Sequence, residues 1–80
     1  MTPELRPVRI DTASLDEEGL LVFVADRLVA VLVKLSEQHG SETGQWFFEH
    51  GFGRLDDPKH PTFMDLDAAK QWIEKRLANK

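Results

Sequence analysis

The most pronounced hydrophobic pattern in the chain is the stretch LLVFVADRLVAVLVKL, which runs from Leu20 to Leu35 and is divided into two apolar runs by Asp26-Arg27. Its apolar residues are mostly leucine, valine and phenylalanine, and the last two favour strands. The stretch is also long enough to form a single helix. The polar interruption between two valine-rich runs favours a β-hairpin instead, with Asp26-Arg27 as a two-residue turn.

This turn predicts a register in which Val22 faces Val31 and Phe23 faces Ala30. Alternating side chains then place Leu20, Val22, Val24, Val29, Val31 and Val33 on one face of the hairpin, and Leu21, Phe23, Ala25, Leu28, Ala30 and Leu32 on the other. An antiparallel sheet with one solvated face normally alternates apolar and polar residues. Because neither face is polar here, the pattern predicts a sheet that is apolar on both sides.

A third strand is predicted from Gln45 to His50, within the aromatic segment GQWFFEHGFG. Residues 36–44 before it are polar, contain two glycines and indicate a loop, and a meander is the simplest connection. After a long loop, Asp65 is a favourable N-cap residue for a C-terminal helix. The apolar stripe of that helix consists of Leu66, Ala69, Ile73 and Leu77, with Trp72 beside it.

The predicted fold class is α+β, with a three-stranded antiparallel meander sheet and one C-terminal helix packed on one face. Residues 20–80 are expected to form this single β-β-β-α domain, since eighty residues leave no room for a second. Residues 1–19 are less regular, because Pro3 and Pro7 interrupt them. We expect an N-terminal arm that is flexible or covers the sheet, and a short extended edge strand is the alternative.

One helix covers one face of such a sheet, so the second apolar face needs another cover. We expect the helix over the face that holds Phe23, joined by Trp46 and Phe48. We favour self-association through the opposite face, and coverage by the N-terminal segment or by a different protein are the alternatives. The predicted interaction residues on that face are Val22, Val31, Val33 and Phe47.

Charge and composition narrow the possible partners. The chain has 14 acidic and 10 basic residues, a formal net charge of −4, and no cysteine. Its basic residues do not cluster, so phosphate backbones repel it and a nucleic-acid partner is not expected. The absence of cysteine excludes disulfides and thiolate metal sites and suits a reducing compartment. No apolar run approaches the ~20 residues that span a bilayer, and no signal-peptide pattern is present, so we expect a cytoplasmic protein without a membrane partner.

Residues with metal-binding or acid–base chemistry are few. His39, His50 and His60 are the candidates for a soft metal, but they lack the i,i+4 or H-x-H spacing of a metal site. The adjacent Asp56-Asp57 indicate a capped turn before proline, rather than a hard-cation site or a general acid–base pair. These patterns predict no metal site.

The segment GFG at 51–53 does not match a phosphate-binding loop, and its glycines are expected to let the chain leave the sheet. The serines and threonines have no nucleophile motif around them. We therefore expect no catalytic residue, no cofactor and no small-molecule substrate, and we do not expect an enzyme.

Two features of the C-terminal half point to a wider comparison: a Trp-bearing strand at Gly44-Gln45-Trp46, and an aromatic residue ahead of an Ala-rich helix in TFMDLDAAKQWI. With three strands before one helix, this arrangement resembles the architecture of AP2-type and phage-integrase arm-binding domains. The resemblance implies nucleic-acid binding through Arg-rich sheet side chains, whereas the corresponding positions here are Leu, Val and Ala. A nucleic-acid-binding module is the alternative, and a small self-associating or protein-interaction domain is the leading hypothesis.

Overall fold

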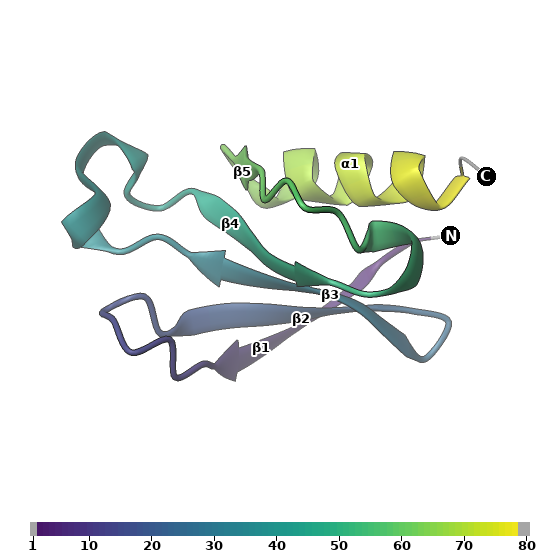
Figure 1. Cartoon of the computed structure of the whole chain (residues 1–80), viewed down its shortest axis with the longest axis horizontal. Helices are drawn as coiled ribbons and strands as arrows, with labels where there is room; N and C mark the ends of the chain where they lie inside the picture. The colour runs from purple at the N-terminus through teal and green to yellow at the C-terminus, as the bar shows by residue number, and fades with distance from the viewer. Residues whose placement is uncertain (1, 79–80) are drawn as a thin grey trace.

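The computed structural model describes residues 2–78, which form one antiparallel sheet with a helix along one side (Figure 1). The strands lie side by side in the order β1-β2-β3-β4-β5. The elements are β1 (Glu4–Arg9), β2 (Glu18–Val24), β3 (Arg27–Lys34), the 3-10 helix η1 (Glu37–Glu42), β4 (Trp46–Gly51), the 3-10 helix η2 (Gly53–Leu55), β5 (Thr62–Phe63) and α1 (Leu66–Ala78). The predicted α+β class, with an antiparallel sheet and a C-terminal helix, is confirmed. The sheet has five strands and not three, because residues at both ends of the predicted meander add one each.

The N-terminal segment is an edge strand of this sheet. β1 pairs with β2 along its whole length, from Glu4 opposite Phe23 to Arg9 opposite Glu18. It therefore extends the sheet sideways and does not lie over its face, and the predicted boundary between residues 19 and 20 falls inside β2. Cross-strand pairing satisfies backbone groups that a free arm would leave to water.

Pro7 occupies a strand position that tolerates proline. The N–H of Ile10 donates to the carbonyl of Glu17, so even-numbered residues of β1 turn their backbone groups toward β2. Pro7 is odd-numbered, and its nitrogen faces away from the sheet, where no ladder hydrogen bond is lost.

The β2–β3 hairpin turns one residue earlier than expected. Ala25 and Asp26 are the central residues, and both have positive φ, 52° and 67°. Positive φ at both central positions matches the right-handed twist of the two strands, as in a type I′ turn. Val24 therefore pairs with Arg27, and Phe23 with Leu28.

A β-bulge beyond the turn decides which side chains share a face. Phe23 pairs with Leu28, but Val22 pairs with Ala30, so Val29 is an extra residue in β3. The earlier turn by itself would shift the cross-strand pairing by two residues, so the same side chains would still share each face. The single extra residue exchanges the faces of β3 relative to β2 for every pair that follows it.

The core lies between the sheet and α1. Its buried residues are Leu20, Val22, Ala30, Leu32, Phe48, Leu55, Phe63, Ala69 and Ile73. Phe48 is fully buried, and its ring meets Trp72 of α1 edge-on at a centroid distance of 5.1 Å. Burying a side chain of this size contributes about 1.5–3 kcal/mol. The predicted placement of Phe48 and Trp46 on the helix side is confirmed.

Both ends of α1 have hydrogen-bonding partners. The Asp65 carboxylate accepts a hydrogen bond of 2.8 Å from the N–H of Ala68, as expected of an N-cap. At the other end, Arg54 of η2 donates to the carbonyl of Leu77, also at 2.8 Å. These contacts satisfy terminal backbone groups that have no partner within the helix.

Candidate interaction surface

The side of the sheet opposite α1 is lined by apolar side chains. The register places Leu21, Phe23, Leu28, Val31, Val33 and Phe47 on this side together with Glu4, Arg6 and His50, and we call this set the open face. Leu21, Phe23, Val31 and Phe47 are each half-buried. Figure 1 shows α1 above the sheet, and within residues 2–78 no helix covers the other side.

Three of the four predicted interaction residues meet on the open face. Val31 and Val33 alternate with core residues along β3, and Val33 pairs directly with Phe47. The placement of Val22 on this face is wrong. Val22 pairs with Ala30 and is completely buried under α1, because the bulge at Val29 exchanges the faces.

Phe23 was expected under the helix and lies on the open face instead. Its ring is partly covered by the guanidinium of Arg6, whose Cζ lies 4.4 Å from the ring centroid. Such a cation–π contact contributes about 0.5–1 kcal/mol at an exposed site. Arg6 also pairs with Glu4 at 2.6 Å, so charged residues of β1 border the apolar surface.

One end of the open face is closed by the chain itself. The Ile10 side chain lies over Gly19, where a Cβ atom would overlap it. Val33 is only 2% exposed. Beside it lies a hollow of about 240 Å³, whose lining includes Thr12, Asp16, His39 and Phe47. The segment after β1 thus covers this end and leaves Leu21, Phe23 and Val31 partly exposed.

Asp16 holds this closed end together. It is a buried carboxylate whose Oδ1 accepts a hydrogen bond of 2.8 Å from the N–H of Ser36. Its Oδ2 lies 2.5 Å from Nε2 of His39 in η1. The contact is an ion pair when the imidazole is protonated and a hydrogen bond when it is neutral.

The environment of Asp16 favours the ionised carboxylate. Burial raises the pKa of Asp16, but hydrogen bonds from Ser36 and His39 outweigh it and hold the pKa well below its usual value of 3.8. The Asp16 carboxylate therefore links the loop before β2 to the loop after β3.

The three histidines have separate structural contacts. His39 binds Asp16, and His50 meets Phe52 edge-on at 4.5 Å. His60 stacks on Phe47 at 5.9 Å, and its Nδ1 lies 2.8 Å from the carbonyl oxygen of Phe48. Among residues 2–78, no group of three or more His, Cys, Asp or Glu side chains is arranged to hold a metal ion.

Asp57 acts as a turn and ion-pair residue. Its carboxylate accepts a hydrogen bond of 2.8 Å from the N–H of Lys59, and it lies 2.6 Å from Arg76 of α1. The hydrogen bond from Lys59 lowers the pKa of Asp57, the positive charge of Arg76 lowers it further, and burial opposes both. These contacts join the loop before β5 to the helix, in agreement with the capped turn predicted for this segment.

Glycine is favoured at the two positions of the GFG segment for different structural reasons. Gly53 has φ +58°, a left-handed conformation that suits a residue without Cβ. Gly51 has ordinary φ, but a Cβ there would overlap the carbonyl of Leu55 and the ring of Phe48. Gly51 therefore allows η2 to pack closely against the end of β4.

The sequence patterns missed several residues of this surface. The pattern predicts Phe23 and Leu21 on the helix side, and it does not single out Asp16. Alternation along β2 alone does give Leu21 and Phe23 a common face, but which face that is depends on the bulge. Nothing in the sequence pattern connects Asp16 with His39, which lies 23 positions later.

Comparison with protein-family models, curated proteins and solved structures finds no match for this chain. The helices within residues 2–78 are too short and too polar to cross a membrane.

Proposed function

We propose that this protein is a small self-associating domain in which the open face of one copy packs on the open face of a second copy. The observation that carries the proposal is the half-buried group Leu21, Phe23, Val31 and Phe47 on one side of a sheet whose other side packs against α1. A contiguous apolar surface of this kind is characteristic of an interface.

The edges of the sheet favour face-to-face over edge-to-edge association. At the β1 edge, Pro7 offers no N–H to an added strand. At the other edge, β5 covers the start of β4, and the N–H of Phe48 donates to the carbonyl of Pro61 at 3.0 Å. Pro7 interrupts the row of donors at one edge, and the strand at the other edge is only two residues long, so the apolar faces are the better contact.

The size of the molecule suits such a dimer. The chain extends 36 × 22 × 21 Å, so the broad side of the molecule is large enough to hold the ~800 Å² per partner that a standard interface buries. A two-fold axis would bring Val31 of each copy near the same apolar group of the other, as an isologous interface requires. Arg6 and Glu4 would lie at the polar rim.

The nucleic-acid alternative has little support from the strand side chains. Arg6 is engaged with Phe23 and Glu4, and Lys34 lies on the helix side opposite Trp46 and pairs with Glu18 at 3.9 Å. Protein–DNA recognition by a sheet needs basic side chains projecting from one face. The apolar open face therefore favours a protein partner.

The test is the solution mass of the chain by analytical ultracentrifugation across a wide concentration range. We expect the mass of a dimer for the unchanged chain and the mass of a monomer for Val31→Lys, because a charge would be buried at the centre of the interface. Gln71→Lys, on the exposed side of α1, makes the same change in charge and should remain dimeric.

Two outcomes oppose the proposal. A folded monomer at millimolar concentration would exclude self-association and leave a different protein as the partner. A dimer that persists in folded Val31→Lys and Leu21→Lys variants would move the interface away from the open face. Amide NMR spectra of each variant establish that it is folded, and a gel shift at low salt with the unchanged chain tests the nucleic-acid alternative.

A further inference from the structure

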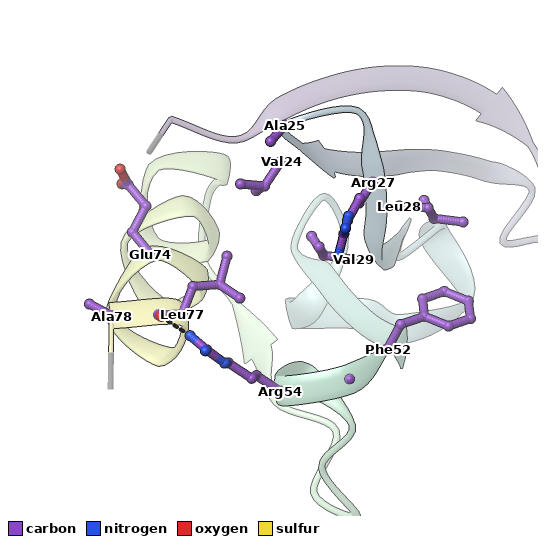
Figure 2. Close-up of a pocket in the computed structure, with 11 residues that line it drawn as sticks. Val24, Ala25, Arg27, Leu28, Val29, Phe52, Arg54, Glu74, Leu77 and Ala78 are labelled. Carbon is purple, nitrogen blue, oxygen red and sulfur yellow. Dashed lines mark hydrogen bonds between the residues drawn. The ribbon is translucent and has the colours of Figure 1, made fainter. Parts of the chain in front are cut away.

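A second hollow lies on the helix side of the sheet, at the end away from η1 (Figure 2). It has a volume of about 710 Å³, within the ~300–1,000 Å³ that ligand pockets usually occupy. Three parts of the chain surround it: the tip of the β2–β3 hairpin, η2 with the residue before it, and the last turn of α1.

Apolar side chains form much of its wall. Val24 and Val29 contribute from the hairpin, and Leu77 contributes from α1. Val29 and Leu77 also pack against the hydrophobic core, so this wall is an exposed continuation of the core. An aliphatic group placed here would be removed from water on several sides.

Two arginines give the hollow a positive charge. Figure 2 shows Arg27 reaching into it from the hairpin and Arg54 reaching across from η2 toward the end of α1. Within residues 2–78 neither arginine forms an ion pair with a carboxylate, whereas Arg6, Arg9 and Arg76 each do.

The backbone contact of Arg54 fixes its position. One of its terminal nitrogens donates to the carbonyl of Leu77 at 2.8 Å, and a guanidinium has further N–H donors for a second partner. Glu74 is the acidic residue of the lining, so two cations and one anion leave a net positive charge. The hollow is thus positively charged, although the formal net charge of the whole chain is −4.

We propose that this hollow binds a small amphipathic carboxylate. The carboxylate would pair with the guanidinium of Arg27, which suits a planar anion, and Arg54 would add a second positive charge to the same wall. Its hydrocarbon chain would lie on Val24, Val29 and Leu77. With Glu74 in the lining, the net charge of the hollow is only +1, which suits a monoanion better than a polyphosphate.

The proposal is tested by amide NMR titration with octanoate, kept below its micelle concentration. We expect saturable shifts at Val24, Val29 and Leu77. Octan-1-ol has the hydrocarbon chain without the carboxylate, and acetate has the carboxylate without the long hydrocarbon chain. At the same concentration as octanoate, neither should produce saturable shifts at these residues. Equal shifts with octan-1-ol, or octanoate shifts that are largest at Leu21, Phe23 and Val31 on the open face, would overturn the proposal.

Variants of the two arginines test whether they recognise the carboxylate of the ligand. Arg27→Gln is at an exposed hairpin position and should weaken octanoate binding at least tenfold while leaving the spectrum of the free protein folded. Arg9→Gln removes an exposed arginine that does not line the hollow and should leave the affinity unchanged. Unchanged affinity in both Arg27→Gln and Arg54→Gln would contradict the site. Because Val24, Val29 and Leu77 belong to the hollow and not to the open face, their shifts report this site separately from dimerisation.

Discussion

Asp16 and His39 meet across the end of the sheet, with Oδ2 of the carboxylate 2.5 Å from Nε2 of the imidazole. One residue lies just before β2 and the other in η1, so the contact joins the two loops at this end of the hairpin. It also sets the limit of the open face. Val33 lies behind the closed end, and Leu21, Phe23 and Val31 remain partly exposed beyond it.

Removing the Asp16 carboxylate should destabilise the fold without unfolding it. Asp16→Ala deletes the acceptor for the Ser36 N–H and the partner of His39, and a hydrogen bond to a charged group contributes about 1.5–3 kcal/mol net. Urea unfolding followed by circular dichroism measures the change. Glu42→Gln, at an exposed position of η1, is the control and should match the unchanged chain. An Asp16→Ala midpoint equal to that of the control would show that the loops do not depend on this contact.

The lowered pKa of Asp16 predicts a loss of stability in acid. The unfolded chain binds a proton at Asp16 near pH 3.8, whereas the folded chain does so at lower pH. The stabilisation is therefore complete above pH 3.8 and decreases as the pH falls below it. Urea midpoints measured from pH 7 down to pH 2.5 should decrease less steeply in Asp16→Asn than in the unchanged chain. Identical slopes would place the acid sensitivity elsewhere, with Asp57 the next candidate because its pKa is also lowered.

Val22 and Val31 should respond differently to the same truncation. Val22 is completely buried under α1, so Val22→Ala leaves a cavity and should cost about 2 kcal/mol of unfolding free energy. Val31 is half-buried on the open face, and Val31→Ala should cost less than about 1 kcal/mol in the monomer. Unfolding measured at low protein concentration separates this effect from dimerisation. A reversed order would mean that the bulge at Val29 is absent and the faces are exchanged.

Gly51 should tolerate alanine less well than Gly53, although Gly53 is the one with positive φ. A Cβ at Gly51 overlaps the Leu55 carbonyl and the Phe48 ring, and such overpacking costs up to about 3 kcal/mol. At Gly53 no atom lies within 4 Å of the added Cβ, so the cost is about 1 kcal/mol for the left-handed backbone. Thermal unfolding of the two alanine variants compares them directly. Equal losses would indicate that η2 moves away from β4 to accept the methyl group.

Local chemistry in the sequence determined the C-terminal helix and the existence of the hairpin. Asp65 at the N-cap and the stripe Leu66, Ala69, Ile73 and Leu77 define α1, and each acts over one or two turns of helix. The valine-rich runs on either side of Asp26-Arg27 likewise define two strands through the preferences of neighbouring residues. The strand expected at Gln45–His50 appears as β4, Trp46–Gly51.

The tertiary structure decided which face of the hairpin the helix covers. An apolar–polar alternation fixes register because a slip would bury polar groups, but β2 and β3 are apolar on both sides. Either face satisfies the pattern, and the bulge at Val29 selects the one with Val22, Ala30 and Leu32. These residues pack against Phe48 and Ile73, which are distant in the sequence, so the local sequence pattern does not predict the contact.

The sequence by itself determined that this small domain has helix-forming and strand-forming segments and more apolar sheet surface than one helix covers. Folding decided the rest: that residues 4–9 pair as an edge strand, that Asp16 reaches His39, and that Leu21 and Phe23 face outward with Val31. The reason is the range of the interactions. Propensity and capping act between near neighbours, whereas strand pairing, bulge position and the contact of Asp16 with His39 depend on residues brought together only by the completed sheet.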